Sequence, residues 1–161
     1  MTDKQDPAWA GGSTVPWLRR RFLTLTAAAT ALAFTVVPDA RASTAELRGR
    51  DFGDTPFTLG VASGDPLPDA VVLWTRLAPR PWEPEGGLPA VGIAFVSWEV
   101  AEDEQFSRVV RRGRAVATSD FGYSVHVDVR GLGPGRSYWY RFRAGPWISP
   151  TGRTRTTPAH G

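Results

Sequence analysis

The sequence lacks cysteine and asparagine, and it has only two histidines among its 161 residues. Without cysteine the chain can form neither a disulfide framework nor a thiolate metal site. His126 and His160 alone do not provide the ligand spacing that is typical of zinc sites. Clustered carboxylates are also scarce: the one run, residues 102–104, more simply solvates a turn than binds calcium. Stability outside the cytoplasm must therefore come from packing alone.

The chain also has no hydrophobic run of the length expected for a membrane-spanning helix. Its apolar run near the N-terminus covers residues 22–37, whereas a helix needs roughly 20 residues to cross a bilayer. Arginines precede this run and Ala40-Arg41-Ala42 follows it, which is the layout of a cleaved export signal. We expect residues 1–42 to be a signal peptide cleaved after Ala42, with a retained membrane anchor as the alternative.

The export signal has a specific pattern. Arg19 and Arg20 are followed by Arg21, Phe22 and Leu23. This order is similar to the twin-arginine signal, in which two arginines precede any residue, then Phe and Leu. We expect the twin-arginine translocase to export the chain, so that it is secreted, periplasmic or held in the cell envelope. A chance basic cluster is the alternative.

Beyond the expected cleavage site there is almost no excess of charge of either sign. Residues 43–161 carry 14 of the 19 basic and 13 of the 16 acidic side chains, a net charge of +1. This balance supplies no field that attracts nucleic acid or an anionic membrane, and we expect neither as a partner. The composition is 42% hydrophobic and 22% charged, which is typical of a globular domain.

Helical periodicity is missing too, apart from a single turn at residues 102–106. A two-residue alternation is present instead, broken at short intervals by turn residues. Residues 43–56 are polar and irregular and predict a linker, so the expected domain covers residues 57–158. The expected strands lie in FTLGVA (57–62), AVVLWTRL (70–77), VGIAFVSWEVAED (91–103), SVHVDVRG (124–131), SYWYRFRAG (137–145) and GRTRTTP (152–158).

The alternation also predicts which side chains share a face. The segment at 70–77 is apolar on both faces, which is typical of a strand inside a sheet. A hairpin is expected between residues 106–110 and 114–118, turning at residues 111–113, where Gly113 can take a positive φ. The side chains expected together on one face of their strands are Phe57, Leu59 and Val61; Val96, Trp98 and Val100; Val125, Val127 and Val129; and Tyr138, Tyr140 and Phe142.

About seven short strands predict an all-β fold, an antiparallel β-sandwich of the immunoglobulin or fibronectin type III kind. The run GLGPGRSY, residues 131–138, resembles the corner of those domains, where a Leu and a Pro precede a Tyr whose hydroxyl bonds back to the backbone. We assign Tyr138 to that structural corner, and Trp98 to the core tryptophan of the sandwich.

The polar side chains predict no catalytic centre. His126 and Asp128 lie two apart on one strand face, where side chains stand parallel, about 7 Å apart. A Ser-His-Asp triad instead needs end-to-end hydrogen bonds. No glycine-rich loop that would cradle phosphate precedes a helix. We therefore expect no catalytic, cofactor-binding or metal-binding residue in this chain.

Five tryptophans follow the expected leader. Trp74 and Trp98 lie in apolar strands and predict core positions. Trp82 and Trp147 lie in proline-rich loops, and Trp139 lies on an outward strand face. These three predict either contact with another domain, which we favour, or a sugar-stacking platform.

Four segments together resemble the alkaline phosphatase D (PhoD-like) family, in the same order and spacing. They are FTLGVASGDPLPDAVVLWTRLAP (57–79), VSWEVAEDEQFSRVVRRGRAVAT (96–118), SVHVDVRGLGPGRSYWYRFRAG (124–145) and SPTGRTRTTP (149–158). The resemblance implies the N-terminal immunoglobulin-like domain of that family. It further implies that phosphoester chemistry belongs to a following metallophosphatase domain, which binds iron and calcium through Asp, Asn, His and Cys side chains. That domain would be the partner of this one.

Three functions are weighed on this basis. The favoured one is the leader and non-catalytic N-terminal domain of an exported alkaline phosphatase or phosphodiesterase, inactive alone. The second is a secreted fibronectin-like module that binds carbohydrate or protein. The third, a self-sufficient small hydrolase, is disfavoured by the missing catalytic centre. In the favoured case the stretch GVASGDPLPDAVVLWTRL (60–77) is scaffold, with a minor role for Asp65 or Arg76 at an interdomain cleft left open.

Overall fold

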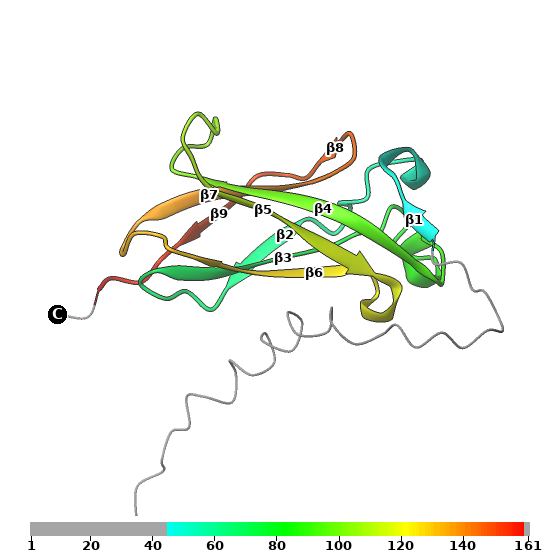
Figure 1. The fold of residues 1–161 in the computed structure, drawn as a ribbon, viewed down its shortest axis with the longest axis horizontal. Coiled ribbons are helices and arrows are strands. Elements are labelled where there is room, and N and C mark those ends of the chain that lie inside the picture. The colour runs from blue at the N-terminus through cyan, green and yellow to red at the C-terminus, as the bar shows by residue number, and fades with distance from the viewer. Residues whose placement is uncertain (1–44, 160–161) are drawn as a thin grey trace, which may run out of the picture. The chain divides into compact units, whose positions relative to one another are not determined.

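Two β-sheets pack face to face in the computed structural model, which describes residues 45–159 (Figure 1). The larger sheet contains β1 (Ala45–Leu47), β4 (Gly92–Ala101), β5 (Val109–Thr118), β7 (Ser137–Ala144), β8 (Trp147–Ile148) and β9 (Gly152–Arg155). The smaller sheet contains β2 (Val61–Gly64), β3 (Ala70–Arg76) and β6 (Ser124–Arg130). Three short 3-10 turns connect strands: η1 (Gly49–Phe52), η2 (Pro84–Gly87) and η3 (Ser119–Phe121). The prediction of an all-β sandwich is confirmed.

The order of strands follows from their pairings. In the smaller sheet β3 lies between β2 and β6, as its two apolar faces predicted. In the larger sheet β4 pairs with β5 along one edge and with β7 and β1 along the other, and β7 in turn pairs with β8 and β9. All of these pairings are antiparallel except that of β1 with β4, which is parallel.

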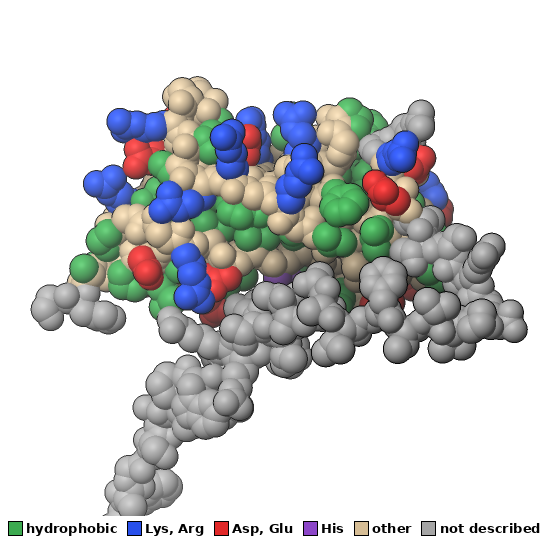
Figure 2. All heavy atoms as spheres, viewed as in Figure 1, with side chains coloured by type: hydrophobic (Ala, Val, Ile, Leu, Met, Phe, Trp, Pro, Cys, Tyr) green, Lys and Arg blue, Asp and Glu red, His purple; other side chains and the backbone are tan. Residues whose placement is uncertain are grey.

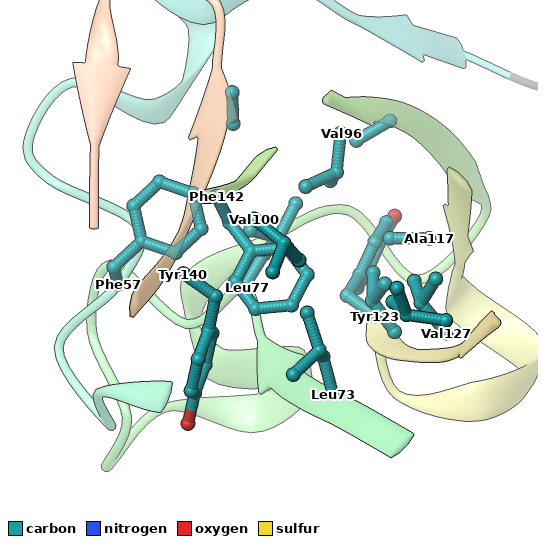
Figure 3. Packing of buried hydrophobic residues seen from close by; sticks show 14 of the residues in the cluster. Phe57, Leu73, Leu77, Val96, Val100, Ala117, Tyr123, Val127, Tyr140 and Phe142 are labelled. Carbon is teal, nitrogen blue, oxygen red and sulfur yellow. The ribbon is translucent and has the colours of Figure 1, made fainter. Parts of the chain in front are cut away.

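The core fills the space between the two sheets, as Figure 3 shows for part of it. The alternations of β6 and β7 supply much of it, because every second side chain of these strands is buried. Burying one valine contributes about 1.5–3 kcal/mol before conformational entropy is counted. The largest fully buried side chains are Tyr123, Tyr138, Phe142, Leu73, Leu77, Val71, Val96, Val100, Val125 and Val129.

The hairpin between β4 and β5 differs from the prediction. Its turn lies at residues 102–108, and residues 109–118 form one continuous strand through the expected turn. Gly113 pairs with Trp98 in the middle of the ladder. A Cβ at residue 113 would be 2.5 Å from Cζ2 of Trp98. The glycine therefore makes room for a half-buried indole and does not form a turn, and Trp98 is only partly buried at the margin of the core.

The beginning of the domain differs as well. Part of the expected linker, residues 45–56, contributes β1, η1 and two side chains of the hydrophobic core cluster, Leu47 and Phe52. The next expected strand begins late, because residues 57–60 form a turn closed by a hydrogen bond from Gly60 N–H to Phe57 C=O (2.9 Å). Leu59 consequently points outward and is 46% exposed. The expectation that Leu59 shares an inward face with Phe57 was wrong.

The corner between β6 and β7 is built around Tyr138. Its ring is buried, and its hydroxyl accepts a hydrogen bond from Gly133 N–H at 2.8 Å. This is the arrangement that the corner motif requires. The C-terminal segment joins it, because Thr156 Oγ1 donates to Gly133 C=O at 2.7 Å. The corner thus ties the β6–β7 loop to the end of the described chain.

The expected signal peptide, with Arg19, Arg20, Phe22, Leu23 and the cleavage site after Ala42, lies outside the described residues, as does His160. Within residues 45–159 there is no helix with the length and apolar character needed to span a membrane.

Candidate interaction surface

The polar pair considered as part of a triad makes other contacts. His126 is exposed and its ring lies 6.1 Å from that of Trp74, at an interplanar angle of 51°. Desolvation of the ring lowers the pKa of His126, so its neutral form is favoured. The Asp128 carboxylate instead accepts two hydrogen bonds from Arg130, at 2.9 and 2.6 Å. This ion pair raises the pKa of the Arg130 guanidinium. His126 and Asp128 are therefore polar groups on the outer face of the smaller sheet.

Metal ligands are not brought together in the described part of the chain. No group of three or more His, Asp or Glu side chains converges within residues 45–159. One carboxylate has a pKa below its ordinary value: the pKa of Asp103 is lowered chiefly by the hydrogen bond from the backbone N–H of Ser107. Its Oδ1 accepts Ser107 N–H at 3.0 Å and its Oδ2 accepts Arg108 N–H at 2.8 Å. Asp103 thus closes the β4–β5 turn.

The loop between β2 and β3 is held by the backbone. Leu67 N–H donates to Ala70 C=O at 2.8 Å, and Thr157 N–H donates to Leu67 C=O at 3.2 Å. Asp65 adopts a positive φ of 46°, in the left-handed region that Asp tolerates better than most residues. Arg76 Nε donates to Gly122 C=O at 2.8 Å, so this arginine fastens β3 to the turn before β6. These contacts fit a scaffold role for the loop.

The three tryptophans expected at an interface differ in exposure. Trp82, in the loop between β3 and β4, is 96% exposed. Trp139 is half-buried in β7, with the Arg153 guanidinium 5.4 Å from its ring centre. Trp147 is partly buried against the core. Only Trp82 of these three remains a fully presented aromatic surface in the described structure.

Other apolar side chains are exposed at the same end of the sandwich as Trp82. The connections β3–β4 and β5–β6 both lie at this end, beside β1 (Figure 1). We name as the apolar end the set of Trp82, Val91, Phe95, Val116 and Phe121, which are 96%, 48%, 49%, 49% and 68% exposed.

Two contacts connect parts of the apolar end. Phe95 and Val116 are directly paired on β4 and β5. Gly92 N–H donates to Ser119 Oγ at 3.3 Å, which joins the start of β4 to η3. The sequence carried a signal for Phe95 and Val116, because both are apolar at outward positions of their alternations, but it did not show that these strands are neighbours.

Comparison with known proteins relates this chain to phosphatases. The family model described as PhoD-like phosphatase, N-terminal domain, matches residues 40–158. Alkaline phosphatase D of Bacillus subtilis (strain 168) is 53% identical over 111 residues, which cover 69% of this chain and 19% of that protein. A solved structure of PhoD matches with 54% identity and a TM-score of 0.65, over 67% of this chain and 20% of that one.

A more distant match is a fibronectin type III domain from a human protein, with 12% identity and a TM-score of 0.44, over 63% of this chain and 74% of that domain. The chain spans about a fifth of the length of the phosphatases that it matches. With more than half of its residues matched by the family model, the chain belongs to the PhoD-like phosphatase family and contains the N-terminal domain of that family.

Proposed function

We propose that this chain is the non-catalytic N-terminal part of an exported PhoD-like alkaline phosphatase or phosphodiesterase, and that it packs against a metallophosphatase domain. The observation that carries the proposal is the 53% identity to alkaline phosphatase D over a segment that is only 19% of that protein. The larger remainder of the relative would supply the hydrolysis of phosphate esters. The β-sandwich described above would supply a rigid docking surface.

The apolar end is the surface that we assign to the interdomain contact. A tryptophan that is 96% exposed leaves a large apolar area in water, and exposed apolar patches commonly mark interaction sites. Tryptophan is also among the residues that contribute most to binding at protein interfaces. Neither Asp65 nor Arg76 is part of this surface.

The iron and calcium implied for the family fit poorly to the residues described here. Cysteine and asparagine are absent from the sequence, and the carboxylates and the histidine of residues 45–159 do not converge in threes. We therefore assign both metals to the metallophosphatase domain and no step of hydrolysis to this domain.

Export completes the proposal. The twin-arginine pathway carries proteins that are already folded, and a domain loaded with metal in the cytoplasm would need that route. The sandwich, which binds no metal in this proposal, would not itself need that route. The signal at residues 19–23 would then be present because of the metallophosphatase domain.

A binding assay tests the proposal. The partner is Bacillus subtilis alkaline phosphatase D without its matched segment, and calorimetry measures its association with the present chain. We expect binding, weakened at least about 10-fold by Trp82→Ala. The control Val109→Ala, which alters an apolar side chain that is 40% exposed and lies outside the apolar end, should bind as the unmodified chain does.

Two further measurements keep the proposal falsifiable. The reading frame that follows the codon of Gly161 should encode a metallophosphatase domain. The purified chain, with and without iron and calcium, should not cleave a chromogenic phosphate ester. Metal-stimulated cleavage by the chain alone would contradict the proposal. Saccharide-dependent quenching of tryptophan fluorescence, without any binding to the phosphatase, would favour the carbohydrate-binding module instead.

A further inference from the structure

The pattern Arg-x-Arg occurs once in each of three strands of the larger sheet. It is Arg112-Gly-Arg114 in β5, Arg141-Phe-Arg143 in β7 and Arg153-Thr-Arg155 in β9. Because side chains alternate along a strand, both arginines of each pair point to the same face.

The register places all three pairs on one face. Glu99 of β4 lies between Arg112 and Arg141, and Ser97 lies between Arg114 and Arg143. On the other side of β7, Arg153 is opposite Trp139 and Arg155 is opposite Ser137. These partners face away from the core, since the intervening residues of β4 and β7 are the ones that pack inward. We name this set of six arginines the arginine face; Figure 2 shows basic side chains in blue over the layer that contains β4, β5 and β7 in Figure 1.

The arginine face is poorly neutralised by the domain itself. Glu99 is the one acidic residue in β4, β5, β7 and β9, and its Oε2 accepts two hydrogen bonds from Arg141, at 3.0 and 2.8 Å. Among the described residues, no carboxylate forms an ion pair with Arg112, Arg114 or Arg143.

Arg153 and Arg155 have neutral partners. They donate to Ser137 Oγ and to Gly135 C=O, each at 3.3 Å. Like charges on neighbouring strands destabilise a sheet. A bound anion would relieve this repulsion.

We propose that the arginine face binds an extended polymer of phosphodiesters. The proposal goes beyond the assigned interdomain role and does not depend on it. The planar guanidinium donates in a fork that matches phosphate oxygens, which a lysine cannot do. Residues 45–159 contain arginine and no lysine, since Lys4 is the one lysine of the chain.

The dimensions of the face suit a polymer better than a single ion. Arginines of one pair are about 6.6 Å apart along a strand. Adjacent strands are about 4.8 Å apart, so the pairs of β5 and β7, which lie on either side of β4, are about 10 Å apart, and six arginines cover several phosphates at once. Two of them are held in place by aromatic rings: Arg141 lies 3.9 Å from the ring centre of Phe106, and Arg153 lies beside Trp139. Such preorganisation lowers the entropy lost on binding.

The residue composition of the arginine face favours a polymer over a folded protein as its partner. The centres of protein–protein interfaces are depleted of charged residues, whereas this face is built from them, and the apolar end is the better protein surface. The net charge of +1, from which we expected no attraction to nucleic acid, is that of all residues from 43 to 161 and not that of this one face. Six arginines and one glutamate leave the face itself with a charge of +5.

The salt dependence of binding tests the proposal. The probe is an oligothymidylate of 20 nucleotides, titrated into the purified chain and followed by fluorescence anisotropy. If six phosphates are neutralised, the slope of log K against log salt is about −4, or roughly a 300-fold loss of affinity between 50 and 200 mM salt. The double variant Arg112→Gln and Arg114→Gln removes two contacts, so its slope should fall to about −3 and its loss to roughly 50-fold.

A matched variant distinguishes the effect of the arginine face on binding from the effect of net charge. Arg48→Gln with Arg130→Gln removes the same two charges at exposed positions outside β4, β5, β7 and β9, and it should keep the slope near −4. Thermal unfolding confirms that both double variants fold. Absence of binding at 50 mM salt, or an equal reduction of slope in both variants, would overturn the proposal.

Binding of two other anionic ligands tests whether a phosphodiester polymer is the right partner for the arginine face. Polyglutamate of equal charge should bind more weakly than the oligothymidylate, because carboxylates are not phosphates; equal binding would overturn the assignment to phosphodiesters. Vesicles of phosphatidylglycerol should bind no more tightly than polyglutamate. Tighter, arginine-dependent binding to the vesicles would overturn the polymer in favour of an anionic lipid surface.

Discussion

The hydroxyl of Tyr138 lies 2.8 Å from the backbone nitrogen of Gly133 and accepts its hydrogen bond across the corner between β6 and β7. Tyr138 is 2% exposed, and Gly133 is partly buried beside it. The bond connects the loop after the smaller sheet to the first residues of β7, which lies in the larger sheet. It is therefore one of the contacts that fix how the chain crosses between sheets.

Replacement of Tyr138 by Phe should lower the free energy of unfolding by about 1–3 kcal/mol. The change removes the acceptor and leaves the Gly133 N–H without its partner, and an unpaired buried donor costs about that much. Urea denaturation with an unchanged m-value measures the loss. Tyr123→Phe is the matched control: it removes a bond from the hydroxyl to Pro89 C=O (2.7 Å) and leaves an acceptor unpaired, not a backbone donor. A loss from Tyr138→Phe below that of Tyr123→Phe would contradict this account of the corner.

Gly113→Ala should destabilise the protein by about 1–3 kcal/mol, the usual cost of overpacking. The added Cβ would be 2.5 Å from Cζ2 of Trp98, which is the rigid part of a ring. Gly64→Ala is the control, because nothing lies within 4 Å of a Cβ there, and its effect should stay within about 0.5 kcal/mol.

A double-mutant cycle identifies the cause of the Gly113→Ala effect. Trp98→Leu makes room at the contact, so adding Gly113→Ala to it should cost much less than Gly113→Ala costs alone. Strictly additive losses would show that the indole is not the obstacle.

The sequence was sufficient to predict strands in which one face is buried. In β6 and β7 the apolar side chains recur at every second residue, and burial enforces that period. The sequence was not sufficient to predict the role of Gly113, because a single sequence does not distinguish a glycine that makes room for Trp98 from a glycine that forms a turn. The three Arg-x-Arg pairs were visible as well, but a face exists only once the strands that carry them are known to be neighbours.

Lowering the pH should weaken the β4–β5 turn through Asp103. Backbone N–H groups lower the pKa of its carboxyl below the ordinary value of 3.8, so the folded state favours the ionised form. Its contribution to stability is therefore complete above the pKa of the unfolded chain and is lost as the pH falls through the lower, folded pKa.

The prediction is that the stability difference between the unmodified chain and Asp103→Asn shrinks as the pH falls below about 4. Urea denaturation at a series of pH values measures this difference. Asp54→Asn provides the comparison, since the Asp54 carboxylate accepts a hydrogen bond from the N–H of the next residue, Thr55, and closes no turn of this length. A difference at Asp103 that stays constant down to pH 2 would show that the charge of Asp103 contributes nothing to the turn.

Glu99→Gln should strengthen binding of the oligothymidylate. The change removes the one carboxylate of the arginine face, which repels phosphate and competes for Arg141, so the affinity should rise while the salt slope stays near the value of about −4 for six contacts. Stability should change by less than about 1 kcal/mol, because the ion pair is only partly buried. Unchanged affinity would mean that Arg141 does not contact the polymer.

Phe52 and Leu59 provide the sharpest contrast between pattern and structure. Phe52 lies in a segment whose polar, irregular composition predicted a linker, yet it is 2% exposed; Leu59 fits a strand alternation, yet it is 46% exposed. The difference arises because Gly60, with a φ of 74°, closes a turn that moves Leu59 out of the inward row, while the turn at residues 49–52 brings Phe52 onto the core. Phe52→Ala should therefore cost about 3–5 kcal/mol, the usual loss for a buried phenylalanine, and Leu59→Ala should cost less than about 1 kcal/mol. Urea denaturation of the two variants measures both losses, and the reverse order would mean that the domain begins at residue 57 and that Leu59 belongs to its core.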